Sequence, residues 1–77
     1  MNKNYYLVKI NSKEDYYKCT EIYKCESEYK LIEYFNKTLA SDMYVVSIEI
    51  VDFDKDKKEL LKKVNKECKL YRNYKEI

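Results

Sequence analysis

The sequence contains no glycine, proline, histidine or tryptophan, and these absences narrow the chemistry open to it. A phosphate-binding loop needs glycines, because backbone N–H groups approach a phosphate closely only where side chains are missing. Histidine is the commonest metal ligand and the side chain that most often acts as a base near neutral pH. We therefore expect neither a nucleotide-binding loop nor histidine-dependent catalysis in this chain.

The three cysteines, Cys19, Cys25 and Cys68, do not replace the missing histidines. A cysteine nucleophile needs a neighbouring base or a lowered pKa, and these cysteines lack the short paired spacing of zinc modules. An odd number also leaves one cysteine outside any internal pairing. We interpret all three as reduced thiols that serve as small buried hydrophobic residues, and we expect no enzymatic activity and no cofactor.

An alternation of acidic residues, Asp52, Asp54 and Asp56, resembles the first ligands of an EF-hand calcium loop. The remainder of that motif is missing, because Lys57 stands where the loop requires glycine and Lys63 where it requires a bidentate glutamate. The start of a helix explains these carboxylates better, since the helix macrodipole favours negative charge there. We expect no metal site at this position.

The composition indicates a folded domain. A chain of 77 residues, 45% of them hydrophobic, is too apolar for a disordered protein, and we predict a single compact domain over residues 1–77. No apolar run is long enough to cross a bilayer and no secretory signal is evident, so we expect a cytoplasmic location in a bacterial host cell. Fifteen lysines against one arginine and one alanine indicate AT-rich codons, and hence a low-GC bacterium or a phage or mobile element within one.

Hydrophobic periodicity predicts three strands and two helices. Alternating apolar residues are typical of strands, and apolar stripes at helical spacing are typical of helices. In chain order the predicted elements are strands over 4–11 and 16–25, a helix over 28–41, a strand over 43–53 and a helix over 55–71. Ser27 and Asp54 are the predicted N-caps of the two helices.

The patterns of two strands need further interpretation. In 16–25, Glu21 falls on the apolar face, which a bulge near Thr20 would repair; a short helix from Ser12 is the alternative. A strand over 43–53 would be apolar on both faces, which is more usual inside a sheet than at its exposed edge. Its expected faces are Tyr44, Val46, Ile48 and Ile50 on one side and Val45, Val51 and Phe53 on the other.

These elements predict an α+β fold with the order ββαβα. A hairpin followed by a right-handed crossover helix would place the third strand antiparallel to the first. The result is a three-stranded antiparallel sheet, in the order 2-1-3, packed with two helices. The first helix covers one face of the sheet, and the second either joins it or covers the opposite face.

Charge is distributed unevenly along the chain. Residues 55–77 hold nine basic and four acidic residues, a net charge of +5, whereas residues 1–54 have a net charge of −3. A phosphate-contacting helix is therefore one hypothesis, and its nucleic-acid-binding residues would be Lys58, Lys62, Lys66, Lys69 and Arg72. A solvated helix face explains these lysines better, because base-specific contacts rely on arginine, of which there is one.

Tyrosine is abundant, with ten residues in the chain. It is enriched in protein–protein interfaces because it offers a large contact area with few rotors to freeze, although AT-rich codons also raise its frequency. We favour a non-enzymatic protein-binding module of phage or mobile-element origin. It would inhibit host machinery, as anti-CRISPR and other anti-defence proteins do, by occupying a surface of a larger protein or ribonucleoprotein. The predicted partner-binding residues are Tyr5, Tyr16, Tyr29, Tyr34, Glu49 and Asp52.

Two other hypotheses stay open at this point. Nucleic-acid binding through the basic final helix is the alternative to protein binding. A homodimeric structural or regulatory domain, which pairs an exposed edge strand to complete a small core, is the third.

Overall fold

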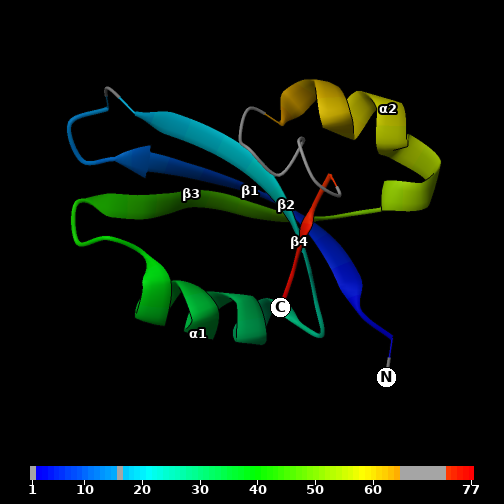
Figure 1. The fold of residues 1–77 in the computed structure, drawn as a ribbon, viewed down its shortest axis with the longest axis horizontal. Helices are drawn as coiled ribbons and strands as arrows, with labels where there is room; N and C mark the ends of the chain where they lie inside the picture. The colour runs from blue at the N-terminus through cyan, green and yellow to red at the C-terminus, as the bar shows by residue number, and fades with distance from the viewer. Residues whose placement is uncertain (1, 16, 65–72) are drawn as a thin grey trace.

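A β-sheet with one helix on either side is the framework of the chain (Figure 1). The computed structural model describes residues 2–15, 17–64 and 73–77. In chain order the elements are β1 (Asn4–Ser12), β2 (Lys18–Cys25), α1 (Glu28–Thr38), β3 (Met43–Val51), α2 (Phe53–Lys63) and β4 (Lys75–Glu76). The predicted α+β class and the order ββαβα of the longer elements are therefore confirmed.

The sheet has four strands in the order β3-β1-β2-β4. β1 lies in the middle and pairs antiparallel with both β2 and β3, which confirms the predicted arrangement of the three long strands. β4 pairs parallel with β2 through Tyr23 and Lys24, so the sheet is mixed rather than purely antiparallel. The sequence analysis missed β4, because a strand of two residues is too short to show a period.

The hairpin of β1 and β2 is regular. Its register runs without a shift from Asn4 opposite Cys25 to Asn11 opposite Lys18, so the bulge expected near Thr20 is absent from these residues. In the turn, Asp15 adopts a φ of 59°, a conformation that glycine usually supplies and that Asp and Asn tolerate best among the other residues. A chain without glycine thus forms its tight turn with an aspartate.

β3 contains the irregularity that the sequence analysis placed in β2. Ser47 pairs with Lys9 and Val45 pairs with Ile10, so Val46 has no partner on β1. This bulge reverses the facing of the residues before it, and Val45 joins Ile48 in packing against the core on the α1 side. The expected placement of Val45 and Ile48 on opposite faces is therefore wrong.

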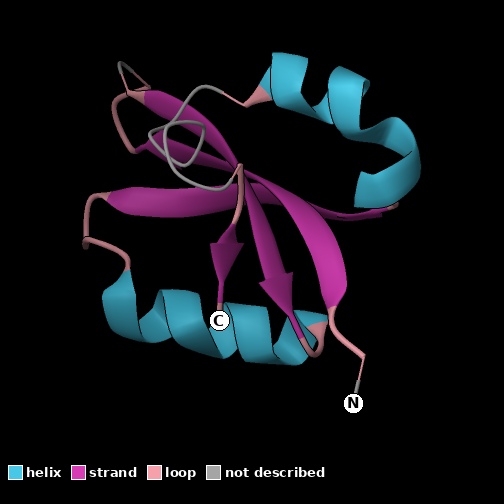
Figure 2. Cartoon of the chain, turned by 45° about the vertical axis from the view of Figure 1, so that its right-hand side comes forward, coloured by secondary structure: helices cyan, strands magenta, loops and turns pink. Residues whose placement is uncertain are grey.

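The two helices cover opposite faces of the sheet, which resolves the alternative left open by the sequence (Figure 2). On the α1 side, Leu31 and Phe35 pack with alternate residues of β1 and β2. On the α2 side, Phe53, Leu60 and Val64 pack with Leu7 and Ile22. The core is thus divided into two thin layers by the sheet. No helix among residues 2–15, 17–64 and 73–77 is long and apolar enough to cross a membrane.

Both helices begin at side-chain caps. Ser27 accepts a hydrogen bond from the backbone N–H of Lys30, as expected. The cap of α2 is Asp52, which accepts from the N–H of Lys55, and not Asp54 as predicted. Asp54 instead lies in the first turn, because β3 ends two residues earlier than the apolar pattern indicated.

α2 is shorter than the predicted helix over 55–71. It ends at Lys63, and Val64 has an extended backbone with φ −75° and ψ 127°. The apolar stripe expected at helical spacing is Leu60, Leu61, Val64, Cys68 and Tyr71. Leu60 and Val64 are buried as expected and Leu61 is half-buried, while Cys68 and Tyr71 lie outside the described residues.

Candidate functional site

The exposed hydrophobic residues gather on one part of the molecule. Among the described residues, five large hydrophobic side chains are exposed, and all of them belong to α1 or β3. We call this set the α1–β3 surface: Tyr29, Ile32, Tyr44, Val46 and Ile50. Ile50 is 63% exposed and Tyr29 is 72% exposed. Contiguous exposed apolar residues mark interaction sites more often than scattered ones do.

A groove between α1 and β3 runs through this surface, where the helix passes alongside the strand (Figure 1). Its volume is about 390 Å³ and its lining is mainly apolar. The lining residues are Ile32, Phe35, Asn36 and Leu39 from α1 or its end, and Met43, Tyr44, Val45 and Ile48 from β3. The helix supplies these side chains because residues three and four apart share one face.

β3 forms one edge of the sheet, so one side of its backbone pairs with β1 and no described strand pairs with the other. An edge strand carries a row of N–H and C=O groups that can pair with another chain. Natural edge strands are usually protected by charged residues or kept short. β3 has nine residues, of which Glu49 alone is charged, so its edge is long and its protection consists of one charge and the bulge at Val46.

Acidic residues surround this edge. Asp42, Glu49, Asp52 and Asp54 are all exposed, and the sequence from 42 to 54 contains no lysine or arginine. Asp42 precedes β3, Glu49 lies within it and Asp52 follows it, whereas Asp54 belongs to the first turn of α2 and lines a separate polar cleft. The α1–β3 surface is therefore apolar along its groove and negative along its rim.

Tyr5 lies on the other side of the sheet from the groove. Its ring stacks on Phe53 at a centroid distance of 4.9 Å and meets the edge of Tyr74 at 5.3 Å. The ammonium of Lys24 lies 5.2 Å from the centroid of the same ring. A hydrogen bond to Tyr5 raises the pKa of Lys24. Tyr5 is therefore half-buried and engaged within the molecule.

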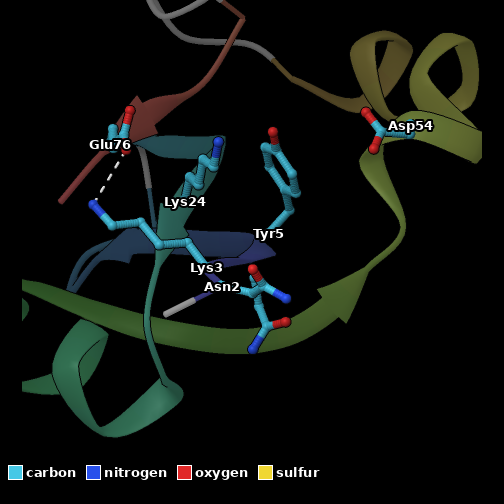
Figure 3. A pocket seen from close by; sticks show the side chains of 7 residues that line it. Asn2, Lys3, Tyr5, Lys24, Asp54 and Glu76 are labelled. Atoms are coloured by element: carbon cyan, nitrogen blue, oxygen red, sulfur yellow. Dashed lines mark hydrogen bonds and ion pairs between the residues drawn. The ribbon is translucent and has the colours of Figure 1, made fainter.

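A polar cleft opens beside Tyr5, and Figure 3 shows the side chains around it. Its volume is about 690 Å³. Lys3 points toward Glu76, at 3.1 Å, and also donates to the backbone oxygen of Ile77. Since its cations already have acidic or aromatic partners, the cleft presents no excess of charge for a ligand.

The other predicted partner-binding residues lie in different places. Tyr29, Glu49 and Asp52 belong to the α1–β3 surface or its acidic rim. Tyr34 is half-buried and its ring packs against those of Tyr23 and Phe35, while Tyr16 lies outside the described residues. Of the six predicted residues, Tyr29 thus lies on α1 and Glu49 and Asp52 lie on or next to β3, whereas Tyr5 and Tyr34 are not part of this surface.

A buried polar cluster on β2 escaped the sequence analysis. Glu21 is 4% exposed. Its Oε1 accepts a hydrogen bond from the hydroxyl of Tyr23 at 3.0 Å, and the thiol of Cys19 lies 3.9 Å away. Its Oε2 forms an ion pair with Nζ of Lys75 at 3.2 Å, although not with the geometry of a hydrogen bond. Burial raises the pKa of Tyr23, and the neighbouring carboxylate raises it further.

The two described cysteines, Cys19 and Cys25, are buried, as predicted for both. The thiol of Cys25 donates to the backbone oxygen of Ser27 at 3.2 Å. Burial raises the pKa of Cys25 despite that hydrogen bond, which is the opposite of what a nucleophilic thiol needs. Cys68 lies outside the described residues.

The basic residues proposed for nucleic acid are only partly described. Lys58 and Lys62 are exposed on α2, and Lys62 lies 3.9 Å from Glu59. Lys66, Lys69 and Arg72 lie outside the described residues. Of the five residues, α2 (Phe53–Lys63) contains Lys58 and Lys62.

The α1–β3 surface is the candidate functional site. No protein-family model, curated protein or solved structure matches the chain. Ile32 was not predicted to be exposed because its helical spacing with Leu31, Phe35 and Leu39 is typical of a buried stripe. Val46 and Ile50 were not selected because a strand apolar on both faces suggested an interior position. The signal was present nonetheless, since the predicted order 2-1-3 already placed this apolar strand at an edge.

Proposed function

We propose that the chain is a small cytosolic protein-binding module that docks a larger protein on its α1–β3 surface. The observation that carries this proposal is the location of all five exposed large hydrophobic residues, among those described, on α1 and β3. A strand edge next to an apolar groove suits a partner segment that pairs with the backbone and inserts side chains.

We propose that the chain acts as an inhibitor or an adaptor by occupying a surface of its target protein. A chain with this AT-rich composition suits a phage or mobile element, and small proteins of that origin often block host machinery, including CRISPR-type defence. Binding through a preformed strand edge would cover a surface of the target without chemistry. The target would be a host protein or a protein component of a ribonucleoprotein.

Affinity capture from a low-GC bacterial lysate, with and without nuclease, tests this function. Val46→Lys and Ile50→Lys place charges on exposed positions of the docking edge, where lysine blocks strand addition. We expect each to reduce recovery of a specific protein about tenfold, since interface hot spots contribute about 1.4 kcal/mol or more. Both variants must retain the wild-type circular dichroism spectrum, because their side chains are exposed in the native fold.

The double change Lys58→Ala/Lys62→Ala on α2 is the matched control. It removes two exposed charges on the opposite side of the sheet, and recovery should stay at the wild-type level. Recovery that nuclease abolishes, or that the α2 control abolishes while the edge variants do not, would favour nucleic-acid binding and contradict the proposal.

A further inference from the structure

The α1–β3 surface also indicates the chemistry of its occupant, an inference that rests on the proposed function. We propose that the surface binds an extended basic segment of a partner protein, which adds to β3 as a further strand. Its side chains alternate between apolar residues, which enter the groove beside α1, and lysine or arginine, which meet the acidic rim.

The backbone of β3 supports the strand geometry. β3 is nine residues long and lies at the end of the strand order. A partner strand can therefore form a ladder of main-chain hydrogen bonds along it. Val46 has no partner on β1, and a bulge of this kind increases the local twist that the added strand must follow.

The two faces of β3 differ, and this difference is the reason that we expect apolar and basic side chains to alternate along the partner segment. Ile48 lies opposite Val8 and packs into the α1-side core. Glu49 lies opposite Leu7, a residue of the α2-side core. Because successive side chains of a strand point to opposite faces, every second residue of an added strand lies next to the groove. The residues between them lie on the face that carries Glu49.

The charges select a basic occupant. The edge and its two ends carry Asp42, Glu49 and Asp52, all exposed, with no basic residue between positions 42 and 52. Opposite charges across strands stabilise pairing and like charges oppose it. Lys9 of β1 is exposed and lies opposite Ser47, so a cationic segment is attracted at Glu49 and at the two ends of the edge rather than at its middle. The phosphate backbone of a nucleic acid is repelled at the same three places.

A second copy of the chain fits this edge less well. Two copies of β3 paired antiparallel about Ser47 would bring Asp42 of one copy beside Asp52 of the other, twice in the dimer. This central register thus places like charges together at the two ends of the shared edge, which is destabilising.

Three synthetic peptides of nine residues, the length of β3, test the inference on the intact protein. In the first, lysine alternates with valine; in the second, glutamate alternates with valine; the third has the composition of the first, with its lysines and valines in separate blocks. We expect the alternating lysine peptide to bind about tenfold more tightly than either of the others. Fluorescence anisotropy gives the affinities, and NMR shifts of the amides of residues 43–51 give the location.

Glu49→Lys is the diagnostic variant. It exchanges an attraction for a repulsion within the edge, and we expect about fivefold weaker binding of the alternating lysine peptide. Glu59→Lys is its matched control, because Glu59 is an equally exposed carboxylate on α2. The same change of net charge there should leave the affinity within about twofold of the wild type, since exposed charges beyond a Debye length are screened.

The possible results distinguish the inference about the occupant from the proposed docking function. Tight binding of the alternating lysine peptide at residues 43–51, with loss in Glu49→Lys alone, supports the inference. Equal binding of both alternating peptides at these residues overturns it and leaves docking on β3 intact. If no peptide shifts these amides and Val46→Lys still captures the cellular partner, the proposed function fails as well. Shifts of the same amides with increasing protein concentration, without peptide, would assign the edge to a second copy and overturn the inference.

Discussion

At the residue scale, Glu21 interrupts the apolar face of β2 without disturbing the pairing of the strand. Its place on the apolar face of β2 suggested that a bulge was needed to turn it outward. The strand is regular instead, and the carboxylate stays buried because Tyr23 and Lys75 provide a hydrogen bond and an ion pair. Sequence alone did not reveal these partners, since Lys75 is 54 positions away.

Tyr23→Phe should destabilise the protein although it keeps the aromatic ring. The change removes the hydrogen bond from the Tyr23 hydroxyl to Glu21, 3.0 Å long. A bond to a charged acceptor is worth about 1.5–3 kcal/mol, and the free energy of unfolding should fall by about that amount. Urea denaturation at pH 7 measures it. Tyr29→Phe is the control, because that side chain is exposed and its change should shift the midpoint little.

Stability should also fall at alkaline pH because of Tyr23. Its pKa is raised above 10.0 in the folded state by burial, with a further contribution from Glu21. Below pH 10 both states keep the phenolic proton. Above it the unfolded chain loses the proton while the folded chain retains it, so the free energy of unfolding decreases by at most about 1.4 kcal/mol per pH unit. Urea titrations between pH 9 and pH 11 should show a shallower decline in Tyr23→Phe, and an equal slope would contradict the assignment.

At the scale of elements, the sequence predicts which helices and strands exist better than it predicts where each of them begins and ends. Periodicity located β1, α1 and β3 well because their apolar residues recur over two or more turns or pleats. The end of β3 was misplaced because Phe53 continues the alternation of the strand, although it belongs to α2 and packs on the far face of the sheet. Alternation of hydrophobic residues does not distinguish a strand from the first turn of a buried helix.

The cap of α2 gives a direct test of that boundary. Asp52 accepts a hydrogen bond from the N–H of Lys55 at 3.1 Å, so Asp52→Ala should lower the free energy of unfolding by about 1 kcal/mol. Asp54→Ala removes only a charge from the first turn and should cost a few tenths of a kcal/mol. Thermal unfolding of both variants measures the difference. Equal losses would place the start of the helix elsewhere.

The candidate site was foreseen only in part for a related reason. Tyr29, Glu49 and Asp52 were selected as a surface tyrosine and acidic residues, and all three lie at the α1–β3 surface or its rim. Ile32, Val46 and Ile50 were not selected, because exposure of an aliphatic residue depends on what the remainder of the chain leaves uncovered. That information is tertiary, and it appears once the order of the strands and the side of each helix are known.

At the scale of the whole molecule, the C-terminal strand connects distant parts of the chain. Lys75 reaches Glu21, Lys3 reaches Glu76, and the N–H of Ile77 donates to the backbone oxygen of Lys24 at 2.9 Å. These contacts join the beginning, middle and end of the sequence at one edge of the sheet. They were beyond sequence analysis because each depends on the register of β4, which has no periodicity of its own.

Lys75→Met should reduce stability through this connection. It leaves the Glu21 carboxylate buried without its ion-pair partner, and we expect a loss of about 1–3 kcal/mol in the free energy of unfolding. The double variant Lys75→Met/Glu21→Gln also removes the unpaired buried charge of Glu21, and it should recover part of the lost free energy of unfolding. Guanidinium denaturation of the single and double variants makes the comparison, and a double variant less stable than Lys75→Met would refute it.

The two edges of the sheet are unequal, and this has a consequence for assembly. β4 occupies the outer side of β2 at Tyr23 and Lys24, whereas the outer side of β3 meets no described strand. Growth of a continuous fibre requires each copy to offer two open edges, one to its predecessor and one to its successor. The edge beyond β2 is formed by β4, a strand of two residues, and so short an edge resists strand addition. We therefore expect one partner strand per chain, added at β3, and complexes of one-to-one stoichiometry rather than polymers.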